Sequence, residues 1–340
     1  MTLTQLRYLV AISDAQLNIT VAAQRMHATQ PGLSKQLKQL EDELGVLLFI
    51  RKGRSLKAVT PAGKDVIERA RMILAETSNI QSYAANQRQE RQGQLVITTT
   101  HTQAKFVLPP VVAHITKTYP NVGVHLLQAT ESDALDLLEN KCADIALVST
   151  VEKPPSAGVA LPLYRWRRHV IASSSHPLSR IQHSPDLSQL SNYPLISYDS
   201  STRVNSSLQR AFIAAGLKLR LAITALDADL IKTYVQANLG VGIVAEMALD
   251  RNNAQLCHWP APAEIPECIC WAVLPRDKVI RNYTSELLTT LIPSLKSVDT
   301  RSILEEPVAS ALPPPEWIVF LEQMTRNCSQ HHAEESTCCN

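Results

Sequence analysis

The sequence predicts a small all-α domain at the N-terminus, a long connecting helix, an α/β domain of two lobes and a C-terminal tail. Three observations lead to this fold class. The 340 residues exceed what one hydrophobic core usually supports. Apolar residues recur at helical spacing through the N-terminal part, whereas strand-like runs alternate with helical ones farther along. We therefore expect four parts, with the ranges 1–59, 60–92, 93–292 and 293–340.

Basic residues are concentrated at the N-terminus. The first 92 residues hold 13 Lys and Arg against 8 Asp and Glu, a net charge of +5, and the remainder holds 20 against 23, a net charge of −3. Positive charge gathered on one domain is typical of proteins that bind a polyanion. With 45% hydrophobic and 19% charged residues, the composition excludes a disordered or fibrous chain.

The sequence gives no sign of export, of membrane insertion or of a metal site. The opening residues 1–7 lack a basic stretch followed by an apolar core, and no run of 18 apolar residues occurs. We therefore expect a cytoplasmic protein that does not bind a membrane. Cys268 and Cys270 share one face of a predicted strand, and the Cys and His residues of 328–340 lack an ordered framework. No disulfide framework, metal or cofactor is expected.

The first 45 residues predict three short helices, the last two joined by a tight turn. Apolar residues at helical spacing over 3–12 predict the first helix. Asn18 and Thr20 are candidate caps for a second helix over 21–26, and Thr29 is a candidate cap for a third. The buried stripe of the third helix is expected to comprise Leu33, Leu37, Leu40 and Leu44.

This pattern is typical of a helix-turn-helix, whose second helix enters the major groove of DNA. The segment 51–57 places four basic residues around Gly53, which predicts a hairpin that acts as a wing and neutralises phosphates. The alternative is a three-helix bundle whose basic face is merely solvated. The candidate DNA-binding residues are Gln30, Pro31, Ser34, Lys35, Lys38, Arg51, Lys52 and Arg54.

A long helix is expected after Thr60, with Pro61 at its first position. Apolar and small residues follow at alternating steps of four and three, which is the spacing of a coiled-coil seam. The alternative is a helix that packs only on its own domain. The residues of this predicted seam are Val66, Ala70, Ile73, Thr77, Ile80 and Ala84.

The following part predicts an α/β fold, with helices near 104–117 and 132–140 between the first strands. A second set of strands would form a second lobe and leave a cleft between the two. The expected strands are 95–97, 122–127, 144–148, 170–172, 195–197, 219–224 and 241–245.

Hydroxyl and amide side chains gather where these strands end. Residues 98–104 run from a strand into a helix, where unpaired N–H groups favour an anion. Ser149, Thr150 and 200–202 are opposing candidates, also at the carboxyl ends of strands. These side chains form either an anion site or simple helix caps, and the residues alone leave both open.

Several N-terminal motifs resemble the DNA-binding domain of LysR-type transcriptional regulators. They are Leu6-Arg7-Tyr8, Ala22-Ala23, Thr29 to Gln36, Leu40 to Gly45, Leu48-Phe49 and Val59 to Gly63. The resemblance, which extends to about residue 292, implies a winged helix-turn-helix that binds double-stranded promoter DNA as an activator working with RNA polymerase. It also implies a linker helix that forms homodimers, their pairing into a homotetramer, and a periplasmic-binding-protein-like effector domain of two lobes.

Within that family the chain is most similar to the CysB group, whose members control sulfate assimilation and cysteine biosynthesis. The motifs include Thr99 to Ala104, Tyr164-x-Trp166, His176-Pro177-Leu178, Tyr193-Pro194-Leu195, Thr224 to Val235 and Leu239 to Gly242. The resemblance implies a small anionic inducer, namely acetylserine, with sulfate also bound in the cleft. It transfers the effector-binding role to Thr100, Thr102, Gln103, Ser149, Trp166 and Thr202.

Two positions depart from the group. Ser149 stands where relatives have Thr and keeps the hydroxyl, whereas the loop 199–203 replaces a loop that contains Gly and Phe. Asp199 or Arg203 could therefore change the ligand, so a regulator of another sulfur or small-anion pathway stays open.

Two other classes of function are alternatives to a regulator. A solute-binding protein would share the two-lobed domain but needs a signal peptide and no DNA-binding domain. An enzyme would need a motif such as Gly-x-Ser-x-Gly or a P-loop, and the sequence holds neither. Beyond Pro293 the resemblance fades, and the polar end predicts a flexible tail with one docking helix near 317–321.

Overall fold

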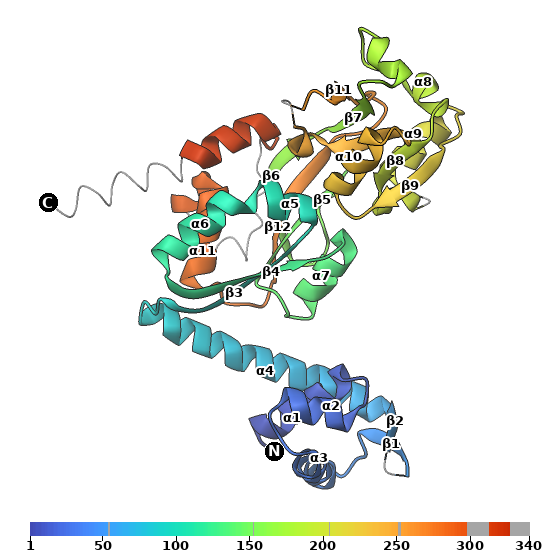
Figure 1. Ribbon diagram of the computed structural model, residues 1–340. Coiled ribbons are helices and arrows are strands. Elements are labelled where there is room, and N and C mark those ends of the chain that lie inside the picture. Colours follow the sequence, from blue (N-terminus) through green and yellow to red (C-terminus); the bar gives the residue numbers. More distant parts are fainter. Residues whose placement is uncertain (54, 152, 204, 251–252, 298–312, 327–340) are drawn as a thin grey trace, which may run out of the picture. The chain divides into compact units, whose positions relative to one another are not determined.

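The computed structural model describes the chain apart from residues 54, 152, 204, 251–252, 298–312 and 327–340 (Figure 1). It divides into two compact units, which we describe separately. The N-terminal unit comprises 1–90 with 277–279, and the C-terminal unit comprises 91–276 with 280–340. Among the described residues, no helix has both the length and the apolar character needed to cross a membrane.

The N-terminal unit contains the three short helices, a hairpin and the long helix that the sequence predicts. Two of the candidate residues cap the helices: Asn18 accepts from Val21 N, and Thr29 accepts from Gly32 N. The third candidate, Thr20, does not cap α2 but lies within it. The elements are α1 (Leu3–Asp14), α2 (Ile19–Arg25), α3 (Gln30–Leu44), β1 (Phe49–Lys52), β2 (Ser55–Val59) and α4 (Pro61–Gln87). Their core includes Leu6, Leu9, Ile12, Leu33, Leu37, Leu40, Leu48 and Phe49.

The wing is an antiparallel hairpin of β1 and β2, and a buried carboxylate fixes it to α3. Glu41 Oε1 accepts hydrogen bonds from the backbone N of Leu48 at 2.9 Å and of Phe49 at 3.3 Å. Its Oε2 accepts from Nη2 of Arg51 at 2.9 Å. Gly53 has a φ of +63° at the tip, a conformation that favours glycine.

Helix α4 begins against the wing. Thr60 caps it through Gly63 N, and a Cβ at Gly63 would lie 2.1 Å from the carbonyl O of Leu48. Only glycine therefore permits this close approach. The predicted seam is divided: Ala70 belongs to the core of the unit, whereas Ile73 is 41% exposed and Ile80 is 64% exposed.

The first lobe of the C-terminal unit is a five-stranded sheet in the order β4-β3-β5-β12-β6. Strand β3 runs parallel to β4 and β5, and β12 returns antiparallel between β5 and β6. The strands are β3 (Gln92–Thr99), β4 (Asn121–Gln128), β5 (Ile145–Thr150), β6 (Val159–Trp166) and β12 (Cys268–Leu274). The helices are α5 (His101–Phe106), α6 (Leu108–Thr118), α7 (Glu131–Glu139) and α11 (Asn282–Leu291).

The second lobe is another five-stranded sheet, in the order β11-β7-β10-β8-β9. Its strands are β7 (Arg168–Ser173), β8 (Leu195–Tyr198), β9 (Leu221–Ala225), β10 (Val241–Ala245) and β11 (Leu256–Pro260). Its helices are α8 (Leu187–Ser191), α9 (Ser207–Ala214) and α10 (Ala228–Gln236). The C-terminal unit as a whole also contains four short 3-10 helices among its described residues. They are η1 (Pro177–Arg180), η2 (Asp199–Thr202), η3 (Glu246–Ala248) and η4 (Pro293–Ser297).

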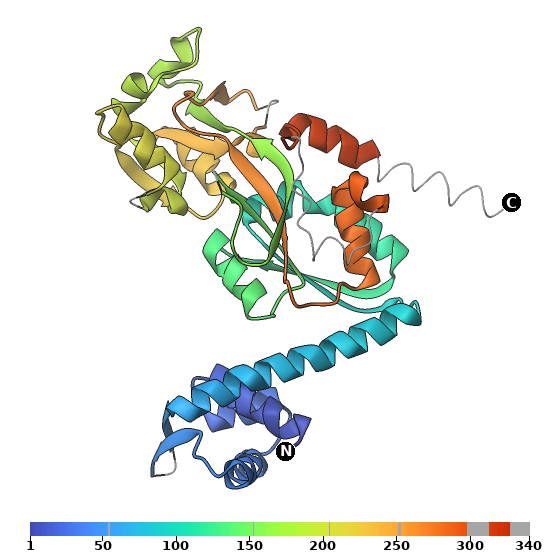
Figure 2. The ribbon, with the colours of Figure 1, turned by 180° about the vertical axis from the view of Figure 1, so that it is seen from behind.

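The chain crosses between the lobes twice, once from β6 to β7 and once from β11 to β12. Figure 2 shows the first crossing in green and the second in orange. The second lobe is therefore one continuous segment between the two crossings, whereas the first lobe is built from the segments before and after it. Polar strand ends of the two lobes line one cavity.

Part of the expected tail is packed on the first lobe. Residues 317–326 form a helix, drawn in red in Figure 1, and Trp317, Phe320 and Met324 are buried in the core of that lobe. Residues 298–312 and 327–340 of the same range lie outside the described residues.

Candidate functional site

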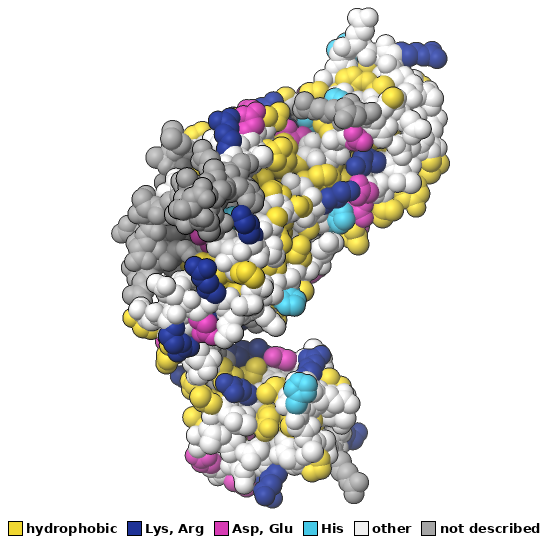
Figure 3. All heavy atoms as spheres, turned by 60° about the vertical axis from the view of Figure 1, so that its left-hand side comes forward, with side chains coloured by type: hydrophobic (Ala, Val, Ile, Leu, Met, Phe, Trp, Pro, Cys, Tyr) yellow, Lys and Arg dark blue, Asp and Glu magenta, His cyan; other side chains and the backbone are white. Residues whose placement is uncertain are grey.

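The candidate DNA-binding residues of α3 are grouped at its start and along one face. Gln30 and Ser34 lie one turn apart, and Gln30 Nε2 donates to Ser34 Oγ at 3.3 Å. Lys35 and Lys38 are exposed, whereas the stripe of Leu33, Leu37 and Leu40 faces the core. Figure 3 shows several Lys and Arg side chains, in dark blue, on the visible face of this unit. The helix therefore offers the hydroxyl and basic groups that a recognition helix needs.

The candidate residues of the wing differ in their surroundings. Lys52 is exposed, but the guanidinium of Arg51 pairs with the buried Glu41. Arg54, a candidate at the tip, lies outside the described residues. Pro31 is near the start of α3, where a missing N–H costs nothing.

A cavity of about 770 Å³ lies between the two lobes of the C-terminal unit. The first lobe contributes Thr100, Thr102, Gln103, Ser149 and Trp166, which the sequence singles out. The predicted residue Thr202 is not among the described residues that line the cavity. Its hydroxyl donates to the backbone O of Asp199 at 2.7 Å, and its neighbours in the second lobe, Ser201 and Arg203, line the cavity instead.

A buried hydrogen-bond network holds the inner wall of this cavity. Gln103 Nε2 donates to Ser149 Oγ at 3.3 Å, and Trp166 Nε1 donates to the same oxygen at 3.1 Å. Tyr164 donates its hydroxyl proton to Gln103 Oε1. These two hydrogen bonds occupy both acceptor positions of the Ser149 hydroxyl, so its own proton is free to be donated. The sulfur of Cys270 is a nearby acceptor for that proton, and an anion in the cavity would be a better one.

Thr100 and Thr102 differ in what their hydroxyls contact. Thr100 is the N-cap residue of α5 but makes no capping hydrogen bond through its side chain. Thr102 is buried and interacts with the hydroxyl of Tyr198, which accepts from the backbone N of Ala245 at 3.0 Å. Tyr198 and Ala245 belong to the second lobe, so Thr102 links α5 to that lobe.

Charged residues that the sequence interpretation missed also line the cavity. Arg168 begins β7, and Glu131 begins α7. Burial raises the pKa of Glu131, and the positive charges of Arg168 and Arg203 oppose that rise. Arg203 Nη2 donates to Ser132 Oγ of the first lobe at 3.2 Å. The cavity therefore combines neutral donors with charges of both signs.

Sequence spacing alone places Tyr164 on the same face of its strand as the candidate residue Trp166, because the two are two residues apart. This spacing does not show what Tyr164 contacts. The positions of Arg168 and Glu131 depend on how the lobes are assembled, which local patterns do not reveal.

Comparison with known proteins gives matches over both units. Residues 3–64 match the family described as "Bacterial regulatory helix-turn-helix protein, lysR family". Residues 88–296 match the family described as "LysR substrate binding domain", which is more than half of the chain. The chain belongs to the LysR family of transcriptional regulators. This assignment removes the alternatives of an enzyme and of a solute-binding protein.

Individual relatives of this LysR-type regulator share most of its length. It is 36% identical to the HTH-type transcriptional regulator CysB of Haemophilus influenzae, covering 90% of this chain and 93% of that protein. It is 32% identical to the regulator SsuR of Burkholderia cenocepacia, covering 91% of this chain and all of that protein. The solved cofactor-binding domain of the Cbl transcriptional regulator superposes with a TM-score of 0.53 at 32% identity. That match covers 59% of this chain and 88% of the domain.

These matches imply two kinds of partner for the LysR-type regulator, DNA and a small ligand. They also agree with the architecture, because an N-terminal helix-turn-helix unit is followed by two mixed α/β sheets.

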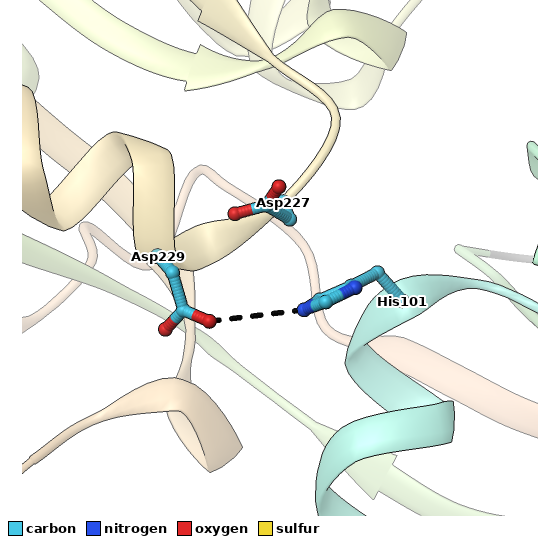
Figure 4. A group of neighbouring side chains, drawn as sticks. All are labelled: His101, Asp227 and Asp229. Carbon is cyan, nitrogen blue, oxygen red and sulfur yellow. Dashed lines mark ion pairs between the residues drawn. The ribbon is translucent and has the colours of Figure 1, made fainter.

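A second polar cluster of the regulator lies at the margin of the cavity, where α5 of the first lobe meets α10 of the second (Figure 4). His101 Nε2 lies 3.7 Å from Asp229 Oδ2, and Asp227 caps α10 through Leu230 N at 2.9 Å. Ligand atoms of His101, Asp227 and Asp229 lie within 4.8 Å of one another, close enough for one cation.

Lysines already neutralise this cluster. Lys105 of the first lobe binds Asp229 Oδ2, and Lys232 binds Oδ1 at 3.0 Å. The hydrogen bond from Lys105 is the main reason why the pKa of Asp229 is lowered to about 2. Both lysines would have to leave before a metal ion could bind, so we assign the cluster to contact between the lobes.

Proposed function

We propose that the chain activates transcription of sulfur-assimilation and cysteine-biosynthesis genes in response to a small anion, either acetylserine or sulfate. The observation that carries this proposal is the network of Gln103, Ser149 and Trp166, which presents neutral donors at the inner wall of the cleft. Neutral donors hold an anion without a buried counter-charge, as hydrogen bonds to charged groups each contribute roughly 1.5 to 3 kcal/mol. The similarity to CysB supports the choice of pathway.

Binding of the anion would favour the arrangement in which both lobes contact it. Thr102, through Tyr198, and Arg203, through Ser132, each already connect the lobes. A ligand that binds one arrangement better than another shifts the population toward it. A shift in the population of lobe arrangements is the step by which a bound anion would change the regulator's action on RNA polymerase.

The proposed DNA contacts are made by α3 and the wing of a homodimer. Ser34, Lys35 and Lys38 would enter the major groove and Lys52 would bind phosphates, which the exposure of the three lysines supports. Ile73 and Ile80 on α4 are large apolar side chains left exposed, which supports pairing with a second copy of this helix. Two such dimers would form the homotetramer.

Titration calorimetry on the full-length protein tests the proposed ligand. Sulfate, O-acetylserine and N-acetylserine are added separately to wild type and to Thr102→Ala, which is expected to bind about tenfold to a hundredfold more weakly. Gel shifts with DNA from upstream of the chain's own gene test the proposed DNA binding. Thr102→Ala should bind this DNA like wild type, since α3 and the wing are unchanged.

A second ligand class is favoured by one observation. Arg203 lies in the loop 199–203 that departs from the CysB pattern, and it lines the cavity. A guanidinium there suits a larger anion with a carboxylate, sulfonate or phosphate group. Binding of such a compound in preference to all three test ligands would make the protein a regulator of another small-anion pathway.

A further inference from the structure

The described residues near the C-terminus are attached to β6, the outermost strand of the first lobe. The backbone N of Arg165 donates to the carbonyl O of Pro315 at 2.9 Å, and Arg165 forms a parallel β-bridge with Glu316. The side chains of Arg165 and Glu316 also pair at 2.9 Å. The helix 317–326 follows directly, and Trp317, Phe320 and Met324 are buried.

Tyr164 lies between this helix and the effector cavity. The centroid of its ring is 5.0 Å from that of Trp317 and 4.6 Å from that of Phe320. At the far end of the same ring, the hydroxyl donates to Oε1 of Gln103. Burial raises the pKa of Tyr164 well above its ordinary value, so the hydroxyl keeps the proton that it donates.

This hydrogen bond decides which end of the Gln103 amide faces Ser149. With Oε1 occupied by Tyr164, Nε2 is the end that reaches Ser149 Oγ at 3.3 Å. A carboxamide can rotate by half a turn about its terminal bond, because this torsion has two broad, similar minima. The reversed amide would direct its oxygen toward an anion in the cavity and would repel it. The reversed amide would also place a donor against the Tyr164 hydroxyl, whose proton would then have the sulfur of Cys270, a weak acceptor, in place of the amide oxygen. Tyr164 therefore favours the orientation that offers donors.

We propose that helix 317–326, acting through Tyr164, positions the Gln103 amide for anion binding in the cleft. The inference rests on the proposed function, because it concerns the same anion site. Tyr164 is a positioning residue, since it is not among the described residues that line the cavity. The helix supports it from behind: without Trp317 and Phe320, one face of the ring on this outermost strand would lose its packing.

The decisive variant is Tyr164→Phe in the full-length protein. It keeps the ring that packs on Trp317 and Phe320 but removes the hydroxyl, so the melting temperature should change little. The affinity for sulfate and for acetylserine, measured by calorimetry, should fall about three- to tenfold, the effect of one hydrogen bond. A purely structural role for Tyr164 would leave that affinity unchanged.

The helix itself is tested by Trp317→Ala, which removes the ring behind Tyr164 and should weaken ligand binding in the same direction. Trp317→Phe restores an aromatic ring and should recover most of the affinity. The matched control is Ile318→Ala, because Ile318 is the next residue of the same helix and is 49% exposed. It should bind ligand like wild type.

The outcomes separate the two proposals. If wild type binds a test anion and Tyr164→Phe binds it equally well, the positioning role is overturned and the proposed function stands. If folded wild type binds none of the test anions, the proposed ligand is wrong and the positioning role falls with it. Should Trp317→Ala fail to fold, Tyr164→Phe still decides whether the hydroxyl positions the amide.

Discussion

Lys105 and Asp229 form an ion pair that joins the first lobe of the C-terminal unit to the second. Lys105 belongs to α5 and Asp229 to α10, and His101 lies 3.7 Å from the same carboxylate oxygen. Any motion that opens the cleft along this margin must break the pair. The ionisation of Asp229 is therefore coupled to the arrangement of the lobes.

This coupling predicts a specific dependence of stability on pH. The pKa of Asp229 is lowered from 3.8 to about 2, chiefly by the hydrogen bond from Lys105. A lowered pKa stabilises the fold at pH values above the unfolded pKa, and the contribution is lost as the pH falls through the folded pKa. We expect Asp229→Asn to be less stable than wild type above about pH 4. The two melting temperatures should then converge toward pH 2.

The difference should be small, under about 1 kcal/mol, because the carboxylate is 42% exposed and solvent screens it. Asp136→Asn, on an exposed side chain of α7, is the control. A gap between wild type and Asp229→Asn that widens in acid would contradict the assignment.

Ser149 is predicted to be the residue whose loss most damages the inner wall of the cleft. Ser149→Ala removes the acceptor shared by Gln103 and Trp166 and leaves two buried donors without a partner. We expect a loss of about 1 to 3 kcal/mol in stability together with weaker anion binding. Ser149→Thr keeps the hydroxyl and should retain both. Thermal melting measures the stability and calorimetry the anion affinity. Equal stability and equal affinity for Ser149→Ala and wild type would exclude this role.

Basic residues of α3 and of the wing should differ in their effect on DNA binding. Lys35→Ala and Lys38→Ala each remove an exposed charge, so each should flatten the slope of log K against log salt by about 0.9. Arg51→Ala should change this slope less but destabilise the N-terminal unit, because Arg51 pairs with the buried Glu41. Lys218→Ala, in the C-terminal unit, is the control. Unchanged slopes for Lys35→Ala and Lys38→Ala would remove α3 from the interface.

Dimer formation is predicted to depend on the second half of α4. Ile80→Asp places a charge at a side chain that is 64% exposed, and it should shift the protein toward monomer at micromolar concentration. Ser78→Asp is the matched control, since residues two apart point to opposite sides of a helix. Light scattering that finds monomer for wild type, or dimer for Ile80→Asp, would argue against this seam.

Local signals in the sequence were sufficient for most of the N-terminal unit. Asn18, Thr29 and Thr60 cap helices as predicted, because a capping side chain acts only on the next three residues. The predicted helix over 104–117 is instead divided at Val107 into α5 and α6. Pro109 and Pro110 follow directly, and proline is tolerated in the first turn of a helix but not in its interior.

The candidate site was predicted in part. Gln103, Ser149 and Trp166 meet because the carboxyl ends of neighbouring strands lie at one edge of a sheet. Tyr164 was not predicted as part of the site, because its role depends on pairing of β6 with β12 and on a helix more than 150 residues away. The prediction of the seam on α4 was wrong at one position for a similar reason. Ala70 is buried in the core of its own unit and is not available to a partner helix.

The bridge between Arg165 and Glu316 attaches the segment 313–326 of this regulator to β6 of the first lobe. The family match ends at residue 296, so a fragment cut there would lose the segment 313–326. Strand β6 would then expose unpaired backbone groups at the edge of its sheet, next to an uncovered apolar surface. Such edges recruit strands from other molecules, so the shortened protein should aggregate in concentrated solution.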